Sequence, residues 1–258
     1  MFNFAKPALL SIALLAGAVA PVLAADYYEP PINIPPPVAY GGWYLRGHIG
    51  MSNQRVGELH NVLFDTATDH EILDKNFESG MIFGGGVGYA INNWARVDVT
   101  GEYRGETGFH GLDTFMDGAT ARFNDYTAKK SEWLFLANAY ADVGEWYGIS
   151  PYVGAGIGAS RNTIHSFRDR GIDLAGSPTL AYADSNSEWN LAWALHAGLG
   201  FKVTDAVTLD LGYSFVHLGD AQSGDIIAYD GTNTIDNPMH FNDITSHDIK
   251  FGLRYAFH

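Results

Sequence analysis

Side-chain polarity alternates residue by residue over long stretches of this chain. The last such stretch is 248–257, in which one face is apolar and the other carries charge. Its apolar positions are Ile249, Phe251, Leu253, Tyr255 and Phe257. Because strand side chains point alternately to opposite faces, the pattern predicts a two-faced β-strand. Such a strand suits a wall between lipid and a wet lumen, although this strand alone also fits the edge of a soluble sandwich.

The same alternation occurs in eight segments, which are separated in turn by short turns and long polar stretches. The segments are 43–51, 81–89, 95–104, 133–143, 151–159, 189–202, 207–215 and 248–257. The long stretches are 53–78, 105–131, 161–187 and 219–245. A soluble sandwich has no reason to place every long loop at one end, whereas a bacterial outer-membrane barrel does. We therefore predict an all-β fold: an eight-stranded antiparallel up-and-down transmembrane β-barrel with short periplasmic turns and four long extracellular loops.

The N-terminus has the features of a secretory signal peptide. Lys6 precedes the short apolar run 8–20, and small residues end at Ala24. The run is shorter than the roughly 20 residues that a membrane-spanning helix needs, and no other run is longer. A membrane-spanning chain of this kind must therefore be a closed barrel. The predicted organisation is a signal peptide (1–24), a proline-rich periplasmic N-terminal segment (25–42) and the barrel (43–258).

Composition excludes several classes of protein. The chain has no cysteine, which excludes a disulfide scaffold and thiolate metal sites. Its formal net charge of −14 argues against nucleic acid as a partner. Glycine (30 residues) and aromatic residues (14%) are abundant, as expected for closely packed β structure.

Charged side chains of both signs occupy the inward positions of the predicted strands. The set is Arg46, Arg96, Asp98, Glu102, Arg104, Asp142, Lys202, Asp210, Asp248, Lys250 and Arg254. One interpretation is a narrow ion path. The other, which we favour, is a packed plug of mutually neutralising charges, because eight strands leave room only for side chains.

Two further groups of residues are candidate sites. Acidic residues in the first and last long stretches suit divalent cations, but we favour the interpretation that they make a solvated, soluble loop. An acyl-transfer enzyme would need a serine beside His217 or His247 on the outward face, whereas Ser214 and Ser246 fall on the inward face. We therefore expect no enzyme, no metal site and no cofactor.

Several short motifs resemble a known family. They are Asn138-Ala139-Tyr140, the segment 151–156, Leu211-Gly212-Tyr213 and the segment 250–257. They are similar to the small opacity-type, OmpA-like eight-stranded outer-membrane barrels, particularly the major alphaproteobacterial ones. The resemblance covers 43–257 and is specific for fold and location but weak for activity.

The resemblance implies export through the periplasm to the outer membrane of a Gram-negative bacterium. It implies a C-terminal signal for the barrel-assembly machinery at Lys250, Gly252, Tyr255 and Phe257, which in relatives ends on the aromatic residue, whereas here His258 follows. It also implies outer-membrane lipids and lipopolysaccharide as partners. In relatives whose mature chain begins Ala-Asp, the N-terminus can be joined to peptidoglycan, and Ala25 and Asp26 match that start.

From these features we expect a structural protein that supports envelope integrity and presents surface loops, tethered to peptidoglycan in one version of the hypothesis. Two alternatives stay open. One is a low-conductance porin for small solutes, and the other is a surface adhesin or receptor.

Overall fold

The computed structural model describes residues 41–172 and 176–257. The predicted signal peptide, the attachment residues Ala25 and Asp26, nearly all of the segment 25–42, and His258 lie outside the described residues. None of the described residues forms a helix long and apolar enough to cross a membrane.

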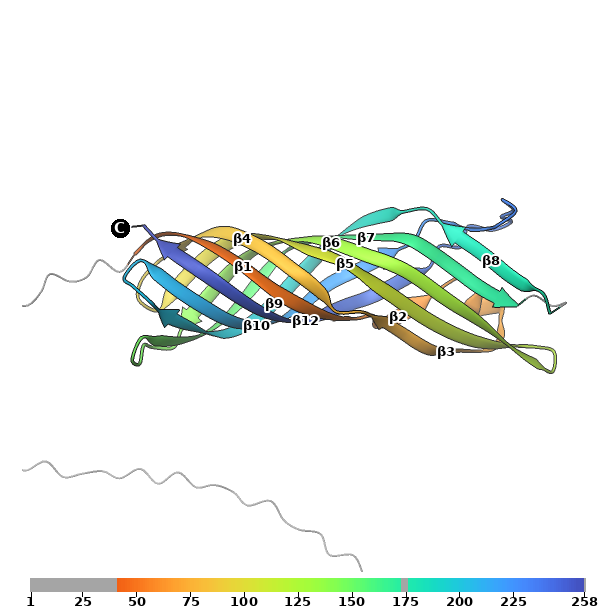
Figure 1. The fold of residues 1–258 in the computed structure, drawn as a ribbon, viewed down its shortest axis with the longest axis horizontal. Coiled ribbons are helices and arrows are strands. Elements are labelled where there is room, and N and C mark those ends of the chain that lie inside the picture. Colours follow the sequence, from red (N-terminus) through yellow and green to blue (C-terminus); the bar gives the residue numbers. More distant parts are fainter. Residues whose placement is uncertain (1–40, 173–175, 258) are drawn as a thin grey trace, which may run out of the picture. The chain divides into compact units, whose positions relative to one another are not determined.

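Eight strands pair in a closed antiparallel ring (Figure 1). In ring order they are β1 (Gly42–Arg55), β4 (Gly80–Ala90), β5 (Ala95–Asp117), β6 (Thr120–Asp142), β7 (Ile149–Ile172), β9 (Asn186–Lys202), β10 (Val207–Gln222) and β12 (His240–Ala256). The last strand, β12, pairs with β1 along its length, from Tyr44 opposite Ala256 to Arg55 opposite Thr245. The ring therefore has no unpaired edge, as the interior of a bilayer requires.

The outer face of the ring is apolar, and one end of it has only short turns. Ile49, Phe83 and Leu191 are more than half exposed, as lipid-facing side chains are. Each end of this apolar band is marked by aromatic contacts. Trp43 lies 5.4 Å from Tyr89 at the end with the short turns, and the rings of Trp133, Phe135 and Trp189 stack at the other end, where Tyr103 also packs on Trp133. These rings have the positions of interfacial girdles.

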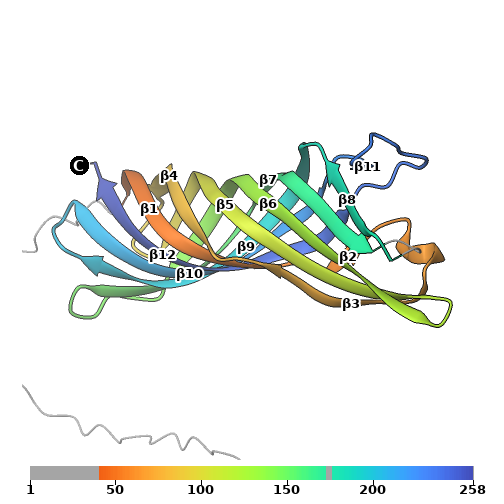
Figure 2. The same ribbon diagram turned by 45° about the vertical axis from the view of Figure 1, so that its right-hand side comes forward.

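Beyond these rings, at the end away from the short turns, the strands continue past the ring and form a cap (Figure 2). The hairpin of β5 and β6 has only a tight turn at its tip, between Asp117 and Thr120. Five short elements complete the cap: β2 (Glu58–His60), η1 (Phe64–Thr66), β3 (Thr68–Phe77), β8 (Pro178–Ala183) and β11 (Ile226–Ala228). The four long connections therefore contain secondary structure of their own, since 105–131 and much of the other three stretches form strands.

β-Bulges explain why these strand extensions were not predicted. β5 shifts its register against β6 between Arg104 and Thr107, so that inward side chains are even-numbered before the shift and odd-numbered after it. β7 shifts near Ser166, which has a φ of 56°. An extra residue shifts the period-two pattern by one position. A prediction based on strict alternation therefore ends the strand at each bulge.

Several glycines lie where neighbouring backbone leaves no space for a side chain. A Cβ at Gly158 would lie 1.9 Å from the carbonyl oxygen of Phe135 on β6. At Gly47, on the lipid-facing side of β1, the nearest atom would be 3.9 Å away. The glycine at 158 therefore allows β6 and β7 to approach closely, while that at 47 is not required by packing.

Candidate functional site

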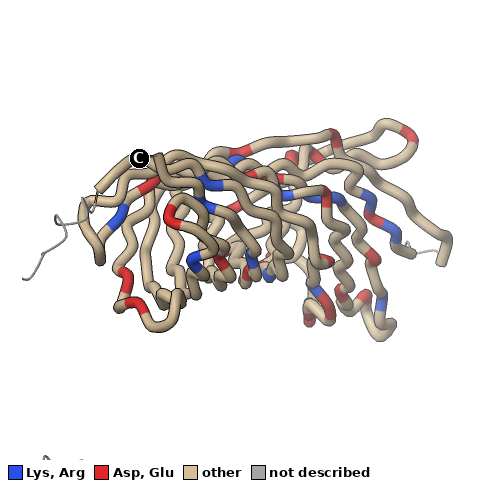
Figure 3. Tube along the Cα trace, turned by 60° about the vertical axis from the view of Figure 1, so that its left-hand side comes forward, with Lys and Arg blue, Asp and Glu red and all other residues tan. Residues whose placement is uncertain are grey.

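The inward face of the barrel carries the predicted charges in paired form. In Figure 3 basic and acidic positions lie among one another along the barrel wall. All the predicted lumen residues except Lys202 point inward, and each lies in an ion pair within the described residues. Buried charges of this kind need such partners, because an unpaired charge away from water is costly.

Lys202 differs from the prediction. It is the last residue of β9, it is exposed, and its Nζ lies 3.0 Å from Asp205 Oδ1 in the following turn. Lys202 has an inward position in the alternation of β9, but the barrel wall ends at this residue, so its side chain extends into solvent.

Three ion pairs fill the part of the lumen near the short turns. Arg254 Nε lies 2.7 Å from Asp210 Oδ2, and Arg96 Nε lies 3.2 Å from Asp142 Oδ2. Arg46 Nη1 lies 2.8 Å from Asp98 Oδ2 and also donates to the Tyr140 hydroxyl at 2.9 Å. The partners come from neighbouring strands in the first two pairs and from the non-adjacent strands β1 and β5 in the third. These contacts close the interior from one wall to the other.

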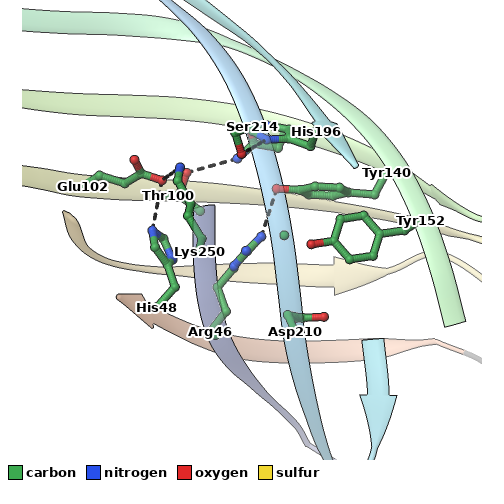
Figure 4. A pocket seen from close by; sticks show the side chains of 13 residues that line it. Arg46, His48, Thr100, Glu102, Tyr140, Tyr152, His196, Asp210, Ser214 and Lys250 are labelled. Atoms are coloured by element: carbon green, nitrogen blue, oxygen red, sulfur yellow. Dashed lines mark hydrogen bonds and ion pairs between the residues drawn. The ribbon is translucent and has the colours of Figure 1, made fainter. Parts of the chain in front are cut away.

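Farther from the short turns, Glu102 contacts His48 and Lys250 in the lumen (Figure 4). Its carboxylate lies 2.5 Å from Lys250 Nζ, 3.0 Å from His48 Nε2 and 3.3 Å from Arg104 Nη2. Arg104 also forms a two-pronged pair with Asp248 on β12. A fork of two parallel hydrogen bonds is a geometry that the guanidinium group favours.

Several members of this network were not in the predicted set. His196 contacts Ser214 at 2.9 Å and Asn138 at 3.1 Å, and Glu132 pairs with both Arg104 and Lys130. His196, Ser214 and Asn138 occupy predicted inward positions. They were not in the predicted set because that set contained only Asp, Glu, Lys and Arg. Glu132 and Lys130 were missed because the strand β6 was expected to begin after them.

The cavity that remains in this network is about 20 Å³. It is lined by Arg46, His48, Thr100, Glu102, Asn138, Tyr140, Tyr152, His196, Asp210, Gly212, Ser214, Lys250 and Gly252. That volume is close to what a single water molecule needs. The lumen is therefore a packed interior at this level, without room for a solute.

Between these ion pairs and the cap, the interior of the barrel becomes apolar. Phe241 lies 4.8 Å from Phe109 and 6.0 Å from Phe77, measured between ring centres. Leu134, Val216 and Ile244 are fully buried in the same cluster. The cluster continues from the outer half of the barrel into the cap, so a single hydrophobic core holds the cap on the barrel.

The histidines considered for an enzyme lie apart from the serines. His247 Nδ1 lies 2.7 Å from the Tyr213 hydroxyl on the outside of the barrel, and His217 Nε2 lies 3.6 Å from Asp243 Oδ1. Ser214 and Ser246 are buried inside, where Ser246 donates to Asp248 at 2.5 Å.

The residues of the C-terminal motif are divided between the two faces of β12. Lys250 and Gly252 face the lumen, whereas Tyr255 and Phe257 are about half exposed on the outer face. The amide of Phe257 donates to the carbonyl of Trp43 at 2.9 Å, which joins the end of the chain to the start of β1.

A closed ring with an apolar exterior and a paired polar interior defines a transmembrane β-barrel, the class found in bacterial outer membranes. A family model described as "Outer membrane protein beta-barrel domain" matches residues 10–257. The chain belongs to this family, and it is an outer-membrane protein of a Gram-negative bacterium.

Similar proteins include both uncharacterised and named members. An uncharacterised protein of Brucella suis biovar 1 is 31% identical over 277 residues, covering 94% of this chain and 95% of its own length. A protein of Rickettsia bellii, named as a candidate adhesin, is 26% identical and covers 83% and 87% of the two chains. The crystal structure of Neisserial surface protein A aligns with a TM-score of 0.44 at 17% identity, over 84% of this chain and 97% of that one.

Proposed function

We propose that this protein is a non-conducting outer-membrane barrel that supports the envelope and presents a rigid cap to the outside. The observation that supports this most directly is the filled interior, in which ion pairs leave a cavity of about 20 Å³. An apolar cluster then closes the outer half, from Leu134 to Phe241. An ion crossing this interior would have to break several buried pairs at once, which is costly.

Planar-bilayer recording of the purified full chain tests the non-conducting role. We expect no stable conductance from the folded protein. A stable, ion-selective conductance would support the porin alternative and would overturn the proposal.

Adhesion is a second candidate function, and the surface of the cap favours it. Phe123, Tyr182 and Tyr229 are exposed there on separate segments, at 49%, 44% and 72%. Exposed aromatic side chains are the residues that protein interfaces use most. The name of the Rickettsia bellii relative points in the same direction.

Substitution of the three exposed aromatic residues separates adhesion from a purely structural role. Phe123→Ser, Tyr182→Ser and Tyr229→Ser together remove the exposed rings without touching the buried core of the cap. For an adhesin, bacteria that carry this triple variant bind cultured host cells less than bacteria with the unchanged protein, at equal surface amounts. Equal binding would favour envelope support as the role. The sensitivity to detergent of a strain that lacks this protein measures that role.

Attachment to peptidoglycan is part of the same proposal. Its only support is the pair Ala25-Asp26, which would begin the mature chain after removal of the predicted signal peptide. Mass spectrometry of lysozyme-digested sacculi tests it. A muropeptide on Ala25 is the expected product, and its absence from intact sacculi would refute the tether.

A further inference from the structure

A second cavity, of about 360 Å³, lies in the extracellular cap. β7 passes the outer girdle at Arg161, which pairs with both Trp133 and Trp189, so the cap residues of β7 beyond it are outside the bilayer. Thr66 and Thr68 line the cavity and are exposed, so it reaches the surface. Its volume is in the range of small-molecule sites.

The wall of this cavity combines aromatic rings with carboxylates. Phe64, Phe115 and Tyr126 supply the rings, and Asp113, Asp117 and Asp169 supply the acids. Among the described residues that line it there is no lysine or arginine. Among these described lining residues, His70 is the only one that can carry positive charge. The electrostatics therefore disfavour an anion and favour a cation.

Asp113 is fixed in place and has its hydrogen bonds satisfied. It is fully buried and accepts from the Tyr126 hydroxyl at 2.6 Å and from the backbone amide of Asn124 at 3.1 Å. His70 Nε2 lies 3.0 Å from the same carboxylate, and the His70 ring stacks on Phe64 at 4.0 Å between ring centres. This group orders one wall of the cavity without any ligand.

Asp169, unlike Asp113, does not have all its hydrogen bonds satisfied. It lies opposite Tyr126 in the register of β6 and β7 and lines the cavity. Its Oδ1 is shielded from solvent and has no hydrogen-bond partner in the described structure. A buried carboxylate oxygen without a donor is costly, and such groups in native structures call for a specific explanation.

We propose that the cavity binds small organic amines, with the ammonium group on Asp169 and the apolar part of the ligand among the rings of Phe64, Phe115 and Tyr126. An ammonium group supplies a hydrogen-bond donor to the Asp169 carboxylate, which accepts no hydrogen bond from the described residues, and it is also attracted to the faces of aromatic rings. The inference goes beyond the proposed function and does not depend on it, because binding is measured on the purified protein.

Binding of an amine at this site depends on pH. Burial raises the pKa of Asp169 to about 7, and repulsion from Asp113 and Asp125 adds to the effect. The groups that face it are Asp113 on β5, Asp125 and Tyr126 on β6, and His70 across the cavity on β3. The carboxylate form, which attracts an ammonium group, therefore predominates above about pH 7.

Calorimetric titration of the folded full chain in nonionic detergent tests the proposal, with phenethylamine as the probe. Phenethyl alcohol and phenylacetate are matched neutral and anionic probes, and protein-free micelles give the background. We expect saturable binding of the amine at about pH 8, weaker by roughly tenfold at about pH 6. We expect Asp169→Asn to weaken it by about tenfold or more, because the charge is lost without a change of shape.

Asp236→Asn is the matched control, since Asp236 is an exposed acid of the cap outside the cavity. Its affinity for the amine should equal that of the unchanged protein. Three results would overturn the proposal: no saturable binding of the amine, equal binding of the alcohol, or full binding by the Asp169→Asn variant. If that variant does not fold, as judged by heat-modifiable migration, the pH profile of the unchanged protein decides.

Discussion

Arg46 Nη1 on β1 lies 2.8 Å from Asp98 Oδ2 on β5, and the strand β4 separates the two in the barrel wall. Asp98 also accepts from the Tyr44 hydroxyl at 3.0 Å and from Asn138 Nδ2 at 2.8 Å. One carboxylate thus joins three strands through the interior. Contacts of this kind make the lumen part of the stabilising core instead of a passage.

Replacing this carboxylate should destabilise the barrel strongly. Asp98→Ala leaves Arg46 buried without its charge partner, and we expect a loss of about 3–5 kcal/mol in the free energy of unfolding. Denaturant unfolding in lipid vesicles measures it. Glu106→Ala is the control, because Glu106 pairs with Lys129 on the exposed surface, where an ion pair adds little to stability. Similar losses in both variants would contradict the assigned role of the interior pairs.

The hydrophobic core of the cap depends on Phe241. This ring is fully buried against Phe109 and Phe77, so Phe241→Ala leaves a cavity and should cost about 3–5 kcal/mol. Because the lost contacts lie in the cap, protease cleavage of the extracellular segments should become faster in intact cells. Phe123→Ala, at an exposed position of the same cap, should leave the cleavage rate unchanged. Equal cleavage in the two variants would mean that this hydrophobic cluster does not hold the cap segments in place.

Close approach of β6 and β7 requires a glycine at 158. Gly158→Ala places a Cβ against the carbonyl of Phe135, so the two strands must move apart and lose pairing hydrogen bonds. We expect less folded barrel in the outer membrane, measured as the heat-modifiable fraction on unboiled gels. Gly47→Ala meets no atom closer than 3.9 Å and should assemble normally. Normal assembly of both variants would show that the wall can relax around the added methyl group.

Asp169→Asn should stabilise the protein in a pH-dependent way. The folded-state pKa of about 7 lies above the ordinary 3.8, so the folded chain holds this proton more tightly than the unfolded chain. Stability from this group therefore falls as the pH rises from about 4 to about 7 and is constant above that. The variant lacks this loss. The difference in free energy of unfolding between the variant and the unchanged protein should therefore grow from near zero at about pH 4 to ~1–3 kcal/mol above about pH 7. Unfolding curves across this range measure it, and a pH-independent difference would be inconsistent with the raised pKa.

The fold class and the contents of the lumen were predictable from the sequence. A strand that crosses lipid must alternate strictly, so Phe251 and Lys250 could be assigned to opposite faces from their spacing alone. The same phase placed Arg46, Asp98 and Glu102 inside. What spacing cannot give is the partner of each charge, because that depends on which strands lie opposite one another across the ring.

The cap could not be predicted, because bulges reset the alternation at positions such as Ser166 and the segment between Arg104 and Thr107. Past each bulge the local pattern no longer says which side chains share a face with those before it. The sequence by itself therefore determined the membrane-spanning wall, where the two-sided environment of lipid and lumen imposes one rule on every residue. Only the tertiary structure decided the cavity around Asp169, since its walls come from strands distant in the chain that meet outside the membrane, where no such rule applies.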